Sequence, residues 1–292
     1  SGSDSGERAK DFLEEFVRSA YIFEAFGKTL ATGGAAAPWK ELVPKTRWHQ
    51  QKFDEISWTI YGILVSGAAQ PFMLLLALMR KYLANDSWMK SADLIAFLKE
   101  IKNYQFRWSI AGKGSTSTHR RLYRKAATMV SLAQNSGDLR SAMREFCDGA
   151  SKKGATDPQF KGGLSKLVYS NTRKKDVYKV RYILREIETS KSTRSLDFSR
   201  LQTIEHIEPQ AKKSESTPRN SWVFKLGNLM LLPSDVNSTL PDSFSEKAPK
   251  LAQYVGDFEE VLLKAITNGV WGNELAGRRQ GDLEDLACEI WP

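Results

Sequence analysis

The sequence of 292 residues lacks the features that mark several common protein classes. It has only two cysteines, Cys147 and Cys288, too few for a zinc cluster or a disulfide framework. No apolar run is long enough to cross a bilayer, and the first residues do not resemble a signal peptide. Internal repeats, coiled-coil heptads and low-complexity tracts are also missing. We therefore expect a globular cytoplasmic protein with reduced cysteines and no zinc support.

The chain is rich in apolar residues and positive charge. Hydrophobic residues make up 41% of it, which is typical of a globular protein. The net charge of +9 favours an anionic partner, either nucleic acid or a membrane surface. Because no apolar span is present, we expect nucleic acid and no membrane. The length allows two domains.

Helical periodicity dominates the chain. The run Met73–Met79 is apolar on all sides, so its helix should be central and buried. A phosphate-binding loop is rejected at Gly112–His119, because the preceding segment is helical and the Gly-x-x-x-x-Gly-Lys pattern is missing. The predicted helices cover residues 8–31, 46–66, 71–83, 91–110, a segment that opens at His119, 172–189, 246–254, 258–268 and 272–291.

One stretch, residues 203–247, gathers the residues suited to chemistry. A short β-branched segment ends at Glu205-His206-Ile207-Glu208-Pro209 and predicts a strand. Residues 229–232 are an apolar run that predicts a second, buried strand. Ser234 or Asp235 should then cap a short helix that carries Asn237.

Hydrolysis of a phosphodiester needs a base near neutral pH and a cation beside the phosphoryl group. A neutral imidazole suits the first task, so His206 can be the base. A hard cation such as Mg²⁺ prefers oxygen ligands, which Glu205 and the Asn237 amide can supply. Adjacent strand residues point to opposite faces, so Glu205 and His206 would share one metal only if the strand bends. Asn228 can brace the loop and so fix the angle of the imidazole.

In these residues the chain resembles the HNH, or ββα-metal, nucleases, since eight residues separate Asn228 from Asn237. It resembles in more detail the C-terminal nuclease half of the GmrSD-type restriction endonucleases, which includes SspE-like nicking enzymes of phage defence. The matching motifs are Glu-His-Ile-x-Pro, Gly-Asn-Leu with a following Leu-Leu, Asn237 and Phe-Ser-Glu-Lys ending at Lys247.

The resemblance implies catalytic roles for His206, Asn228, Asn237 and Lys247, the last as a phosphate or structural contact. It also implies Asn237 as a metal ligand. Together with the chemical argument above, this makes Glu205, Asn237 and His206 the candidate metal ligands, and we expect the cation to be Mg²⁺ or Mn²⁺. Family members usually carry an N-terminal nucleotide-hydrolysing or modification-sensing domain. Nothing here resembles it, so we expect such a domain as a separate partner or as a missing N-terminal part.

The expected fold is mainly α, a helical body with a small embedded ββα-metal (HNH-like) motif. We expect two domains, a DNA-positioning body over residues 1–195 and a nuclease region with closing helices over residues 196–292. Basic residues should contact DNA phosphates without reading sequence. The candidates are Arg120, Arg121, Arg124, Lys125, Lys174, Arg181, Arg185, Lys212, Lys213 and Arg219.

These observations predict a metal-dependent DNA endonuclease that nicks, because one such site cuts one strand per reaction. Two alternatives stay open. One is a DNA-binding module with a vestigial or regulated nuclease site, and the other is an RNA-directed nuclease. The sequence does not distinguish oligomeric states.

Overall fold

The computed structural model describes residues 2–45, 48–84, 88–112, 116–170, 174–193, 202–209 and 221–292. The chain divides into two compact units, Ser1–Ala155 and Thr156–Pro292. The division expected at residue 195 therefore lies inside the second unit. Helices α7 (Asp157–Leu164) and α8 (Lys174–Lys191) belong to that unit because both pack against the C-terminal helix α12 (Asn273–Ile290).

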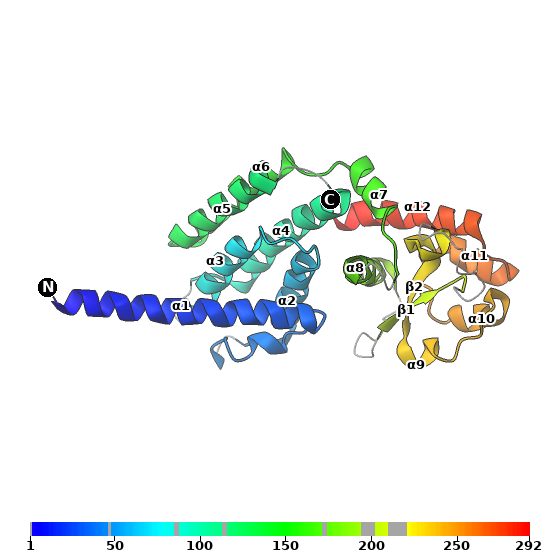
Figure 1. Ribbon diagram of the computed structural model, residues 1–292, viewed down its shortest axis with the longest axis horizontal. Coiled ribbons are helices and arrows are strands. Elements are labelled where there is room, and N and C mark those ends of the chain that lie inside the picture. Colours follow the sequence, from blue (N-terminus) through cyan, green and yellow to red (C-terminus); the bar gives the residue numbers. More distant parts are fainter. Residues whose placement is uncertain are drawn as a thin grey trace. The chain divides into compact units, whose positions relative to one another are not determined.

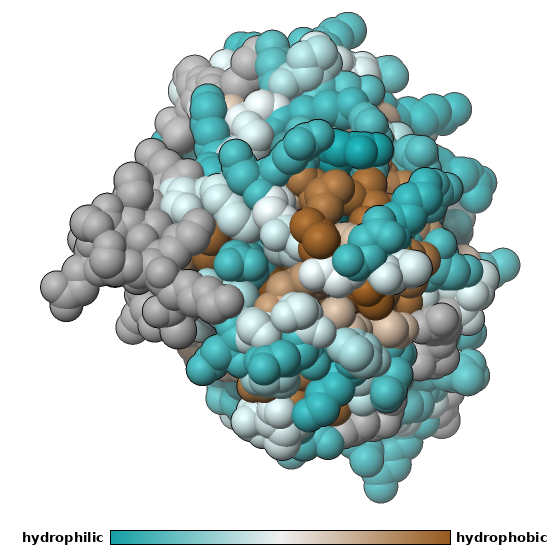
Figure 2. Space-filling model, turned by 90° about the vertical axis from the view of Figure 1, so that its right-hand side faces the viewer, coloured by the Kyte–Doolittle hydropathy of each residue, from teal (hydrophilic) through white to brown (hydrophobic). Residues whose placement is uncertain are grey.

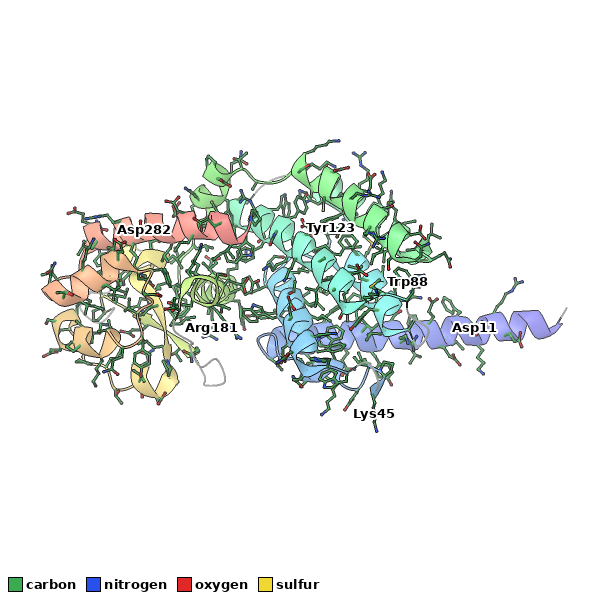
Figure 3. All side chains as sticks on the ribbon, turned by 180° about the vertical axis from the view of Figure 1, so that it is seen from behind. Asp11, Lys45, Trp88, Tyr123, Arg181 and Asp282 are labelled. Atoms are coloured by element: carbon green, nitrogen blue, oxygen red, sulfur yellow. The ribbon has the colours of Figure 1, made fainter. Side chains whose placement is uncertain are left out.

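The first unit is a bundle of helices with one hydrophobic core (Figure 1). Helix α3 is central, as its apolar sequence predicts, and Leu74, Leu75 and Leu78 are fully buried, although Met73 is exposed. Tyr123, labelled in Figure 3, is buried in the same core. The helices are α1 (Gly2–Ala31), α2 (Gln50–Leu64), α3 (Phe72–Leu83), α4 (Ser91–Ala111), α5 (Thr116–Leu132) and α6 (Ser136–Ser151).

Helix α1 buries only part of its apolar face. Phe26 is buried against Trp39 and Phe72, whereas Phe12 and Phe16 are 66% and 63% exposed. The helical spacing predicted this helix correctly. The spacing does not show whether another element covers the apolar face, and among the described residues nothing covers Phe12 and Phe16.

The second unit wraps helices around a small antiparallel sheet (Figure 1). The two strands pair over five residues, from Gln202 opposite Pro233 to His206 opposite Leu229. The elements are α7 (Asp157–Leu164), α8 (Lys174–Lys191), β1 (Gln202–His206), β2 (Leu229–Pro233), α9 (Ser234–Asn237), α10 (Phe244–Leu251), α11 (Glu260–Asn268) and α12 (Asn273–Ile290).

The two faces of the sheet meet different helices. Residues directly opposite on antiparallel strands share a face. Met230 and Leu232 pack in the core formed with α10, α11 and α12, so their partners Glu205 and Thr203 lie on that side. His206 alternates to the other face, and α8 packs on β2 in the same unit.

Apolar side chains also gather on the surface of the second unit, framed by hydrophilic ones (Figure 2). Helices α11 and α12 line a hollow of about 720 Å³, to which Val261, Val270 and Leu275 contribute. In the described part of the chain, no helix combines the length and apolarity that crossing a bilayer requires.

Candidate active site

The two strands and the helix expected around His206 are present as β1, β2 and α9. Helix α9 packs on both strands. The predicted cap is wrong, because Pro233 occupies the N-cap position and no side chain caps the helix. Ser234 is already the first helical residue, since β2 runs directly into α9 without an intervening loop.

His206 ends β1 in a largely buried position, with 9% of its surface exposed. Its ring centroid lies 5.5 Å from that of Tyr169 and 6.1 Å from that of Phe224. Burial, and secondarily the positive charge of Lys247, lower the pKa of His206 to about 4. The imidazole is therefore neutral near pH 7, the form that accepts a proton from water.

Lys247 is buried on α10, with 1% of its surface exposed. Its ammonium group donates to the carbonyl oxygen of His206 at 2.6 Å and to Oε1 of Glu205 at 2.5 Å. A hidden ammonium needs such partners, because an unpaired buried charge is costly. Of the two roles that the resemblance implied for Lys247, the structure provides the structural contact.

Asn228 is fully buried and uses both ends of its amide. Its Oδ1 accepts from the Glu208 N–H at 2.8 Å and from the Trp271 indole N–H at 2.8 Å. Its Nδ2 donates to the carbonyl oxygens of Val223 at 2.9 Å and Glu208 at 3.1 Å. The residue thus ties the loop before β2 to the chain that leaves β1, as the bracing role requires.

Glu205 and Asn237 provide a donor set that fits a hard cation. The Asn237 Nδ2 donates to the Thr203 hydroxyl at 2.9 Å, and Thr203 shares a strand face with Glu205. Among the described residues, Oε2 of Glu205 and Oδ1 of Asn237 accept no hydrogen bond. A carboxylate and an amide oxygen suit Mg²⁺ or Mn²⁺, which keeps several waters beside few protein ligands.

The strand alternation separates His206 from these two oxygens, because β1 is regular through its five residues. The described residues contain no cluster of three or more His, Cys, Asp or Glu side chains that could hold a metal. Glu205 and Asn237 therefore fit a metal-holding role better than His206, whose position fits the role of base.

The basic candidates lie on different elements. Arg120, Arg121, Arg124 and Lys125 are exposed on α5 in the first unit, where Lys125 pairs with Glu145 at 2.6 Å. Arg181 and Arg185 are half-buried on α8 in the second unit, and Figure 3 labels Arg181. Lys212, Lys213 and Arg219 lie outside the described residues, as does the side chain of Lys174.

Sequence reasoning gave no site role to Trp271, Glu259 or Arg279. Trp271 is buried, and its indole N–H donates to Oδ1 of Asn228. Arg279 is 2% exposed and lies on the buried stripe of α12 with Ala276 and Leu283. An arginine on an apolar stripe was the available signal, because such a residue must have buried partners.

Taken together, the helical units, the two-stranded sheet and the helix that follows it define a mainly helical protein with a small ββα site. Residues 155–283 match the family model described as GmrSD restriction endonucleases, C-terminal domain. This match implies a DNA nuclease of the restriction-endonuclease type. A search of curated proteins gave no match.

Proposed function

We propose that the second unit is a divalent-metal-dependent DNA endonuclease that nicks one strand per reaction and acts against phage or other foreign DNA. The observation that carries the proposal is the arrangement around β1, where the largely buried His206 ends the strand, Glu205 directly precedes it, and α9, which bears Asn237, packs on the same strand. The family match of residues 155–283 supports DNA as the substrate.

The chain's own residues have separate tasks. His206 accepts one proton from the attacking water, whose oxygen bonds to phosphorus as the bond to the leaving sugar oxygen breaks. Lys247 holds the His206 carbonyl, and Asn228 holds the segment that follows it. A cation held by Glu205 and Asn237 would supply charge stabilisation for the phosphoryl and leaving oxygens.

The test is cleavage of supercoiled plasmid with Mg²⁺ or Mn²⁺, with EDTA as a control. We expect open circles from the unaltered protein and a loss on the order of 10²-fold or more in His206→Ala. His49→Ala is the matched control, because His49 is exposed at the start of α2 in the first unit. Asn237→Ala should also abolish cutting.

Other outcomes assign other functions. Plasmid retardation at low salt without cutting, indifferent to Mg²⁺ and to His206→Ala, would identify a binding module. Structured RNA offered beside the plasmid distinguishes an RNA-directed nuclease. Undiminished cutting by purified His206→Ala would overturn the assignment of the base.

A further inference from the structure

We propose that Arg279 is a positioning residue that sets the catalytic geometry through Asn228, with Glu259 as its anchor. The inference rests on the proposed function and adds Arg279 of α12 and Glu259, which directly precedes α11. It starts from the surroundings of the Arg279 guanidinium group, which is 2% exposed.

One side of the guanidinium group forms a hydrogen-bonded ion pair with Glu259. Its Nη2 donates to Oε1 of Glu259 at 2.7 Å, and its Nε donates to Oε2. Glu259 precedes α11 and is 7% exposed. This two-pronged contact fixes the plane of the guanidinium group, because a carboxylate matches the spacing of two parallel N–H groups.

The other side of the guanidinium group donates hydrogen bonds to the backbone on either side of Asn228. Its Nη1 donates to the carbonyl oxygens of Gly227 and Leu229, each at 2.9 Å. These are the residues immediately before and after Asn228. The loop also packs closely on α12, where the Gly227 N–H donates to Oε1 of Gln280 at 2.6 Å.

The contact chain reaches the base in two further steps. The Asn228 carbonyl accepts from the Ile207 N–H at 2.9 Å, and its side chain binds both the N–H and the carbonyl of Glu208. Ile207 follows His206 directly. The backbone that aims the imidazole is therefore held by Asn228, and Asn228 is held on both sides by Arg279.

The arrangement needs an arginine. A lysine at position 279 could keep one carbonyl or the carboxylate, but its single ammonium group cannot reproduce the fork that joins them. Arg279→Lys retains charge and much of the side-chain volume, so it tests orientation with less disturbance than removal. The matched control is Arg278→Lys, since Arg278 is the exposed neighbour on the same helix.

We expect Arg279→Lys to lower kcat for plasmid cutting about tenfold or more while KM changes less than about twofold. Arg278→Lys should leave both constants unchanged. Thermal unfolding and near-ultraviolet circular dichroism are recorded for each variant, and rates are compared well below every unfolding midpoint. A similar loss in both variants, or no loss in Arg279→Lys, would overturn the proposal.

A second readout does not depend on cutting. The chain has three histidines, so imidazole resonances in a nitrogen–proton spectrum can be assigned by replacing each in turn. Arg279→Lys should shift or broaden the His206 resonances and leave those of His49 and His119 in place. Unchanged His206 resonances would exclude the positioning role, even if kcat falls. A shift in a preparation whose unaltered protein cuts no DNA would retain the positioning role and reject only the nuclease.

Discussion

At the scale of single residues, the two asparagines of the site lie in opposite surroundings. Asn228 is fully buried with four side-chain hydrogen bonds, whereas Asn237 is half-buried with one, to Thr203. Removing the first amide leaves several buried groups without partners, and each costs about 1–3 kcal/mol. Removing the second exposes its partner to water.

We therefore expect Asn228→Ala to lower the free energy of unfolding by about 3 kcal/mol or more, and Asn237→Ala by less than about 1 kcal/mol. Urea denaturation measures both. Cutting should be lost in both variants, but only Asn237→Ala should lose it with its stability intact. Equal destabilisation would show that the two amides do not have these separate roles.

Glu188 is a second residue whose surroundings make a measurable prediction. It is 9% exposed on α8, and burial, followed by the negative charge of Glu259, raises its pKa to about 8. Arg279 acts in the opposite direction and Asp257 in the same direction as Glu259. Near neutral pH the folded protein therefore holds a proton here that the unfolded chain has released.

The folded state binds more protons than the unfolded state between pH 4.5 and about 8, so this group lowers stability as pH rises through that window. Glu188→Gln removes this pH-dependent contribution to stability, because the glutamine side chain does not titrate. We expect the variant's advantage over the unaltered protein to grow by a few kcal/mol from pH 5 to pH 8 and then to level off. A constant difference, measured by urea denaturation at each pH, would contradict the raised pKa.

For single residues, the spacing of motifs in the sequence predicted the candidate site but not the buried contacts around it. His206, Asn228 and Asn237 are candidate site residues because of their order and separation in the sequence, and the two strands and the helix predicted around them are present. The contact between Arg279 and Glu259 was not predicted, because an arginine on the apolar stripe of α12 indicates that it has buried partners but does not show which residues they are. Only the fold shows that their side chains meet.

At the scale of elements, α12 has one face that must fit closely and another that is open. A β-carbon added to Gly227 would lie 2.1 Å from the Ala276 carbonyl oxygen, so only glycine allows the loop to approach α12. A β-carbon added to Gly277 meets nothing within 4 Å. Glycine inside a helix is destabilising relative to alanine by roughly 0.5–1 kcal/mol.

The two glycines should therefore respond in opposite directions to the same change. We expect Gly277→Ala to raise the free energy of unfolding by about 0.5–1 kcal/mol. Gly227→Ala should lower it by about 1–3 kcal/mol and reduce cutting, because overpacking forces loop and helix apart. Denaturation of both variants, beside a plasmid assay, measures this contrast. A stable and active Gly227→Ala would mean that the loop does not depend on α12.

Element types were predictable here because helical and strand periodicities are local. Most of the long helices and both strands lie near the positions that their patterns predicted, but the long helix α6 was not among the predicted helices. The sequence did not show to which of the two units a helix belongs. Val180, Leu184 and Ile187 form a buried stripe on α8, but the spacing of such a stripe does not show which helices cover it. That choice depends on packing across the whole unit.

At the scale of the whole molecule, the excess of positive charge predicts how it binds DNA. The net charge is +9, and α5 in the first unit exposes Arg120, Arg121 and Arg124. Contacts to phosphates release bound cations from DNA, and each adds roughly one to the slope of log K against log salt. A solvated face that does not touch DNA would leave this slope unchanged.

Replacing Arg120, Arg121 and Arg124 together by glutamine separates these cases. If all three contact phosphates, the slope should fall by roughly 2–3, with similar losses on unrelated DNA sequences. The control replaces Lys40, Lys45 and Lys52, which are exposed in the same unit, and removes the same charge. Fluorescence anisotropy across a salt series measures both. If the slope falls only in the α5 variant, the phosphate contacts belong to that helix. If it falls equally in both variants, the effect comes from net charge alone.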